Sequence, residues 1–198
     1  MTWCHCIALD AVSAQPWKNG TGVTRTLAVR ATARGQWRVS LAEIACHGPY
    51  SCFDGVDRHS LIVGGRGIVL RHGDEIVELA PGVPAQYDGK PAWNASLVDG
   101  PCEALNVMVD RLAWRAHIEV LAPATTATFA LPSGSTLLLF SGDAECEIRH
   151  ADERCVTPAR TLARHDVVGD ISAVECTSWP RIVEDAMPSA VVVIDPVV

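Results

Sequence analysis

Short apolar runs, each broken off after a few residues, are the feature that most limits what this chain can fold into. They alternate with polar residues and are separated by Gly, Pro and Asp clusters roughly every 8 to 12 residues, which is typical of an all-β barrel or sandwich. Only residues 111–120 are expected to form a short helix or a connector. The strand candidates are residues 37–45, 61–63, 67–70, 75–79 and 137–140.

An internal repeat divides the chain. The motif Arg-His-x-Asp-Glu occurs at residues 71–75 and again at residues 149–153, a constant offset of 78 positions. Its turn chemistry predicts a hairpin in each copy. A repeat of this kind indicates two similar β units. We expect one domain at residues 1–115 and a second at residues 116–198.

Charge and composition exclude several classes of function. The net charge of −7 argues against general binding to nucleic acid. The N-terminus shows no export signal, and the apolar runs are too short to cross a bilayer. Eight cysteines in such a chain are expected to be reduced thiols. We therefore expect a soluble, cytoplasmic protein with no nucleic-acid or membrane partner.

Residues 16–25 combine two cations, one amide, two hydroxyls and two glycines beside an indole. Lys18 and Arg25 are donors only, whereas Asn19 both donates and accepts hydrogen bonds. Such a mixture suits a small ligand that carries a carboxylate, with Trp17 as a flat wall. The alternative is a solvated, glycine-rich turn between two strands.

Three arginines lie in or beside predicted strands of the first half, at positions 25, 38 and 58. Burying cations without anions is costly. Either acids such as Glu43 and Asp57 pair with these arginines, or a ligand does. We expect the arginines to converge with Lys18 inside the first barrel.

These motifs resemble the HutD/Ves family in their order and spacing. The resemblance rests on residues 16–25, 37–44, 48–53, 55–58 and 106–108. It implies an all-β bicupin, with two cupin-type barrels in one chain. It also implies a link to bacterial histidine utilisation as a modulator, and a small acidic metabolite such as urocanate or formylglutamate as ligand.

The resemblance also implies which residues bind that ligand, all of them in the first barrel. They are Trp17, Lys18, Asn19, Thr24, Arg25, Arg38, Ser40, Arg58 and Asn106. Two assignments remain open. Asn106 is either a satisfied core amide or a ligand contact, and Arg58 either binds the ligand or is braced locally by Asp57.

Metal chemistry of the kind found in many cupins is not expected. Those sites need a His-x-His pair, and no two histidines of this chain are separated by a single residue. Cys4 and Cys6 would share one face of a strand, with His5 pointing away. A Cys-x-x-Cys knuckle is absent. We predict no metal site and no cofactor, and the sequence assigns no catalytic residue because it has neither a nucleophile elbow nor a phosphate loop.

Three functions remain open. The first is a metal-free protein that binds a small carboxylate metabolite and modulates histidine utilisation. The alternative is a cofactor-independent isomerase or lyase for an acidic metabolite, with Lys18 as base or Schiff-base nucleophile. A third is a homodimeric scaffold, because exposed strand edges of small barrels pair between subunits.

Overall fold

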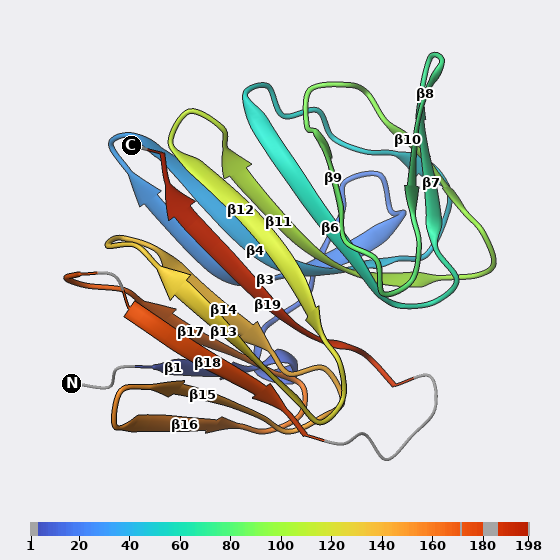
Figure 1. Ribbon diagram of the computed structural model, residues 1–198. Coiled ribbons are helices and arrows are strands. Elements are labelled where there is room, and N and C mark those ends of the chain that lie inside the picture. Colours follow the sequence, from blue (N-terminus) through green and yellow to red (C-terminus); the bar gives the residue numbers. More distant parts are fainter. Residues whose placement is uncertain (1–3, 171, 180–185, 198) are drawn as a thin grey trace. The chain divides into compact units, whose positions relative to one another are not determined.

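The protein is built almost entirely from β-strands (Figure 1). The structure, a computed structural model, describes residues 4–170, 172–179 and 186–197. Within these ranges the one helical element is a short 3-10 turn, η1 (Leu9–Ala11). No helix in the described part of the chain has the length and apolarity needed to cross a membrane. The prediction of an all-β fold is confirmed.

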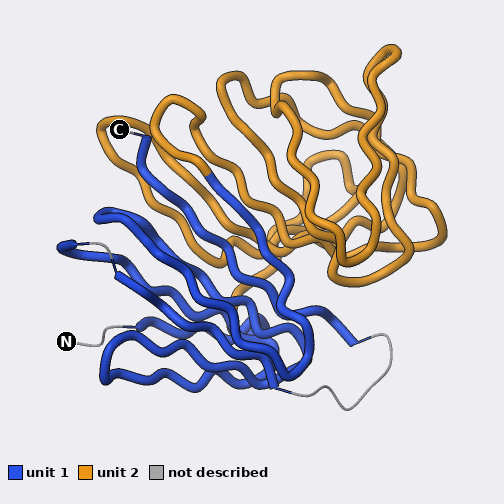
Figure 2. The backbone as a smooth tube through the Cα atoms, viewed as in Figure 1, with its two compact units in different colours: residues 1–11, 116–198 blue, residues 12–115 orange. Residues whose placement is uncertain are grey.

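The chain forms two compact units (Figure 2). The first unit is residues 12–115, and the second unit is residues 1–11 together with residues 116–198. The sequence-based boundaries placed residues 1–11 in the first domain. Strand β1 (His5–Ala8) instead pairs antiparallel with β17 (Thr161–Asp166), so these N-terminal residues complete a sheet of the second unit.

The first unit encloses its core between two sheets. The six-stranded sheet has the order β2-β3-β4-β11-β6-β9, and the four-stranded sheet has the order β5-β10-β7-β8. Buried apolar side chains from both sheets pack together between them. The strands are β2 (Gln15–Pro16), β3 (Gly22–Thr32), β4 (Gly35–Ile44), β5 (Gly48–Pro49), β6 (Val56–Gly64), β7 (Ile68–His72), β8 (Glu75–Leu79), β9 (Ala85–Asp88), β10 (Asn94–Leu97) and β11 (Cys102–Asp110).

The second unit repeats this plan. Its five-stranded sheet has the order β1-β17-β14-β19-β12 and its four-stranded sheet the order β13-β18-β15-β16. A separate apolar core lies between these two sheets. The remaining strands are β12 (Trp114–Leu121), β13 (Thr125–Leu131), β14 (Thr136–Phe140), β15 (Cys146–His150), β16 (Glu153–Thr157), β18 (Ser172–Ser178) and β19 (Ser189–Pro196).

The prediction of a short helix or connector at residues 111–120 is wrong. Strand β12 occupies most of this segment and lies beside β19 at the edge of its sheet. Its buried side chains are Trp114, Ile118 and Leu121, a spacing that also fits one face of a helix. The segment forms a strand and not a helix because it pairs with β19. No local pattern in the sequence predicts that pairing.

The repeated motif forms a hairpin in each unit, as predicted. Strand β7 pairs with β8 and strand β15 pairs with β16, each across a two-residue turn. The first turn residue has a positive φ in both hairpins, 56° at Gly73 and 51° at Ala151. The two turns therefore have the same geometry but different residues.

Replacing Ala151 by glycine is expected to stabilise the protein. A residue with a Cβ pays roughly 1–2 kcal/mol in the left-handed region, and the greater backbone entropy lost by glycine offsets part of this. We expect Ala151→Gly to raise the free energy of unfolding by about 0.5–1 kcal/mol and Gly73→Ala to lower it by a similar amount. Urea denaturation measures both, and a loss of stability in both variants would show that the turns are not equivalent.

Candidate functional site

One row of the six-stranded sheet carries two arginines toward the inside of the first unit. Arg38 in β4 and Arg58 in β6 both lie directly opposite Met108 in β11, and cross-strand partners share a face of the sheet. Tyr87 in β9 lies opposite Arg58 and belongs to the buried core. This row therefore faces the inside of the barrel.

The neighbouring row on the same face is also polar. Ser40, Asn106 and Ser60 lie opposite one another on the same three strands. The Ser60 hydroxyl donates a hydrogen bond to Oδ1 of Asn106 at 2.6 Å and lies 3.0 Å from the Tyr87 hydroxyl. Nδ2 of Asn106 donates to the carbonyl oxygen of Ala104 at 3.2 Å. The Asn106 amide is thus held within the row, oriented by its neighbours.

Arg58 is enclosed between two aromatic rings. Its side chain is buried, and the guanidinium carbon lies 4.8 Å from the ring centroid of Tyr50 and 5.2 Å from that of Tyr87. A desolvated cation–π contact contributes on the order of 2 kcal/mol. Nε of Arg58 is buried and makes no hydrogen bond within the described part of the chain. The rings hold the cation in place but do not satisfy its N–H donor.

Among the residues that the structure describes, Arg38 has one polar partner, and it is a weak one. Its Nη2 donates to Sδ of Met108 at 3.1 Å, and a thioether is a poor acceptor. Burial lowers the pKa of Arg38, and the neighbouring Arg58 cation lowers it further. Arginine remains protonated in proteins even so. The row therefore holds two positive charges that repel each other.

The carboxylates that the sequence offers as partners are engaged elsewhere. Glu43 forms an ion pair with Arg25, and Asp57 lies 3.0 Å from Nη2 of Arg111. Among the ion pairs between described residues, none involves either arginine of the row. Asp57 consequently does not brace Arg58, which removes one of the alternatives left open by the sequence.

A tyrosinate does not neutralise the row either. Burial raises the pKa of Tyr50 well above its ordinary value, Tyr87 raises it further, and the opposing effect of Arg58 does not reverse this. Tyr50 is therefore a neutral phenol near neutral pH and offers Arg58 only its ring face.

Trp17 and Thr24 lie on the same inner face. Thr24 in β3 is opposite Ala42, a core residue. Nε1 of Trp17 donates to the Thr24 hydroxyl at 2.7 Å, and the indole meets the Tyr50 ring edge-on with centroids 6.0 Å apart. A Cβ at Gly22 would lie 3.3 Å from this indole and 2.4 Å from the Glu43 carbonyl oxygen, so only glycine permits this approach.

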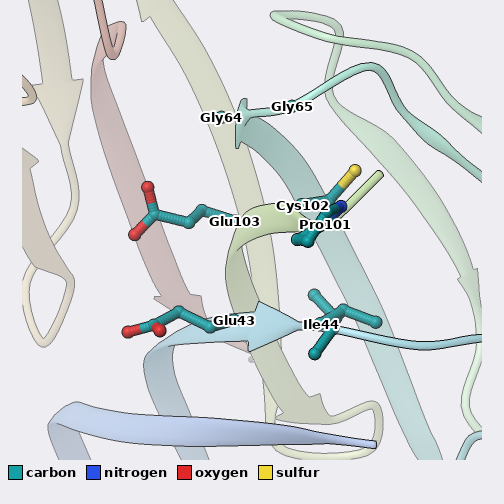
Figure 3. A pocket seen from close by; sticks show the side chains of 8 residues that line it. Glu43, Ile44, Gly64, Gly65, Pro101, Cys102 and Glu103 are labelled. Carbon is teal, nitrogen blue, oxygen red and sulfur yellow. The ribbon is translucent and has the colours of Figure 1, made fainter. Parts of the chain in front are cut away.

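Arg25 does not converge with the other two arginines, contrary to expectation. It lies opposite Leu41, one position along from Thr24, and so projects from the other face of the sheet. Figure 3 shows the same alternation at the end of β4, where the Glu43 side chain points to one side and that of Ile44 to the other. Arg25 and Glu43 share the outer face, where they form their ion pair.

Lys18 and Asn19 lie in the exposed turn between β2 and β3. Oδ1 of Asn19 accepts hydrogen bonds from the backbone N–H and the hydroxyl of Thr21, and Nδ2 donates to the carbonyl oxygen of Pro49. The structure of this segment matches the glycine-rich turn that the sequence left as its alternative. Three of the nine predicted ligand-binding residues, Lys18, Asn19 and Arg25, therefore lie outside the inner face. The other six share it: Trp17, Thr24, Arg38, Ser40, Arg58 and Asn106.

Ser60, Tyr50 and Tyr87 were not identified from the sequence as parts of the site. The sequence does carry a signal for Ser60, because this residue follows Arg58 by two positions on a strand and must share its face. The tyrosines carry no such signal, since they reach Arg58 from other parts of the chain.

A surface pocket of about 320 Å³ lies where β4 and β6 end and β11 begins (Figure 3). Glu43 and Glu103 both contribute to its lining. Two carboxylates make this pocket unsuitable for an acidic ligand.

One group of three potential metal ligands occurs among the described residues, and it lies in the second unit. The sulfur atoms of Cys4, Cys6 and Cys155 are all within 4.8 Å of one another. The polar rows of the first unit contain no such group within the described ranges. The sequence could not reveal this cluster, because Cys155 is 149 positions from Cys6.

The fold and its solved counterparts identify the class of protein. A Cupin 2 conserved barrel domain protein from Leptotrichia buccalis superposes with a TM-score of 0.54 at 9% identity, over 98% of this chain and 96% of that one. The chain therefore has a cupin-type fold with two β units, as predicted. The HutD family model matches residues 9–174, and the chain therefore belongs to the HutD family.

Relatives agree with this assignment. Protein Ves of Citrobacter koseri is 32% identical over 130 residues, 64% of this chain and 67% of the relative. An uncharacterized 21.2 kDa protein in the hutC 3′ region of Pseudomonas putida is 28% identical over 141 residues, 69% of this chain and 72% of the relative.

Two solved structures share the whole fold. A conserved protein of unknown function from Pseudomonas aeruginosa PAO1 has a TM-score of 0.85, and HutD from Pseudomonas fluorescens SBW25, in a formate condition, has one of 0.77. Each is 21% identical and covers 98% of this chain and 100% of its own. These likenesses show the fold.

Removing the Arg38 charge is expected to stabilise the ligand-free protein. An apolar side chain of similar length keeps the packing and relieves both desolvation and repulsion by Arg58. We expect Arg38→Met to raise Tm by about 2–4 °C. Arg111→Met is the control and is expected to lower Tm, because Arg111 lies close to both Asp57 and Asp88. A lower Tm for Arg38→Met in calorimetry would contradict an uncompensated charge.

Proposed function

We propose that this protein binds a small carboxylate metabolite on the inner face of its first barrel, without a metal ion. One observation carries the proposal: Arg38 and Arg58 face the same interior, and no carboxylate of the described residues pairs with either. A bound anion would supply the missing counter-charge. Charge-assisted hydrogen bonds contribute roughly 1.5–3 kcal/mol each.

The surroundings of the arginines suit an organic acid. Nε of Arg58 is a donor without a hydrogen-bond partner among the described residues. The Arg38 guanidinium has five N–H donors, and one of them donates to the weakly accepting sulfur of Met108. The ring of Tyr50 lies against Arg58, and the Trp17 indole meets that ring edge-on, so aromatic side chains line this part of the interior. Two cations suit a dicarboxylate such as formylglutamate, and the aromatic walls suit a planar acid such as urocanate.

The biological role that we propose is modulation of histidine utilisation in the cytoplasm. The Pseudomonas putida relative is named for its place beside hutC, and the family bears the name HutD. A binding protein that responds to an acidic intermediate of the pathway fits these names. No specific observation favours the isomerase or lyase alternative, since Lys18 lies in an exposed turn.

Binding is expected to depend on the inner arginines and not on the outer one. Isothermal titration with formylglutamate and with urocanate compares wild type with Arg38→Met and Arg58→Met. Loss of one charge-assisted contact is expected to weaken binding by at least about tenfold. Arg25→Met is the matched control, because Arg25 projects from the other face. Undiminished binding by Arg38→Met, or no binding of any small acid by wild type at millimolar concentration, would refute the proposal.

Incubation is expected to leave the bound acid chemically unchanged. The Lys18 side chain is exposed, whereas a catalytic lysine of this kind depends on desolvation or on a neighbouring cation. Chromatography of each acid after prolonged incubation with stoichiometric protein measures turnover. A product that forms with wild type but not with Lys18→Met would establish the enzymatic alternative instead.

A further inference from the structure

Three thiols from distant parts of the sequence meet at one edge of the second unit. Cys4 immediately precedes β1, Cys6 lies in β1, and Cys155 lies in β16. Strands β1 and β16 are the edge strands of the two sheets of this unit. Sγ of Cys6 lies 3.5 Å from Sγ of Cys155, and all three sulfur atoms lie within 4.8 Å of one another.

The thiols project toward the inside of the second unit. Cys6 lies opposite Ala163 and Cys155 lies opposite Ile148, and both partners belong to the unit's core. Cys4 is itself a core residue. The cluster therefore has an apolar inner side, while Cys6 is exposed and leaves a route to solvent.

We propose that Cys4, Cys6 and Cys155 bind one soft metal ion through three sulfur ligands. The spacing suits such a site, because a Zn–S bond of about 2.3 Å places the sulfurs of a tetrahedral site roughly 3.8 Å apart. The sulfurs of Cys6 and Cys155, 3.5 Å apart, are already close to that distance. Thiolate ligands select Cu(I) and Zn(II) among the common metals.

The number of ligands favours Cu(I). Among the described residues no fourth His, Cys, Asp or Glu joins the cluster. Zn(II) in proteins is almost always four-coordinate and would need water as its fourth ligand here. Cu(I) is a soft ion for which a sulfur-only set suffices. The site lies in the second unit and is independent of carboxylate binding in the first.

The other thiols provide a control for unspecific metal binding. Cys46 and Cys52 are exposed and lie in the first unit, outside the cluster. A variant that combines Cys46→Ser with Cys52→Ser keeps the cluster intact. A variant that combines Cys6→Ser with Cys155→Ser leaves a single thiol of the three and spares the buried Cys4.

The test is an anaerobic titration of the full, reduced and metal-free protein with Cu(I) and, separately, with Zn(II), each against a competing chelator. We expect one ion per chain for wild type and for the Cys46/Cys52 variant. Affinity is expected to fall by at least about tenfold in the Cys6/Cys155 variant, with circular dichroism confirming that it is folded. X-ray absorption is expected to show sulfur neighbours at about 2.2–2.3 Å.

Each outcome bears on the proposal. Three sulfurs around Cu(I), or three sulfurs and one oxygen around Zn(II), support the site and identify its ion. Equal affinity in the Cys6/Cys155 variant would overturn the proposal, because the ion would then lie on other thiols. The proposal also fails if no stoichiometric binding occurs, or if Cys6 and Cys155 form a disulfide that persists under the reducing conditions of the titration.

Discussion

The pairing of β4, β11 and β6 in one register determines the chemistry of the first unit. In that register Arg38, Met108 and Arg58 form a single row that faces the inside of the barrel. Side chains alternate between faces with a period of two, so a shift of one residue would turn both arginines outward. The apolar row beyond the serine and asparagine row, which includes Ala42 and Ile62, fixes this register, because the same shift would expose the core. The hydrophobic core thus fixes the positions of the Arg38 and Arg58 charges, although apolar packing does not stabilise a charge.

Much of the fold followed from the sequence because its signals are local. Alternation along residues 37–45 identified β4, and turn chemistry identified the hairpin in each unit. Strand β1 was not predicted because its four residues do not alternate between polar and apolar side chains, and its place depends on pairing with β17. Strand β12 was not predicted because the spacing of its buried residues also fits a helix.

The candidate site was predictable only in part, for a related reason. Arg38 with Ser40, and Arg58 with Ser60, share a face by alternation along one strand. Which face of a strand turns inward is decided by the pairing of the whole sheet. In β3 that pairing turns Thr24 toward the interior and Arg25 away from it. The aromatic rings around Arg58 come from Tyr50, which follows β5, and from Tyr87 in β9, which no spacing in the sequence relates to one another.

The second unit shows that arginines on these two central strands are not a requirement of this fold. Arg58 faces Met108 across two strands of the first unit, and in the corresponding strands of the second unit Leu137 faces Val193. In the next row of the first unit Ser60 faces Asn106, and in the next row of the second unit Leu139 faces Val191.

These four apolar residues all belong to the core of the second unit. The same architecture is therefore stable with aliphatic side chains at these positions, which avoid the desolvation of a charge. Two guanidinium groups in the first unit are therefore expected to lower its stability, and under our proposal a bound anion compensates their charge. An increase in stability on removing Arg38 and a loss of anion binding are therefore expected together, because both would follow from one electrostatic arrangement.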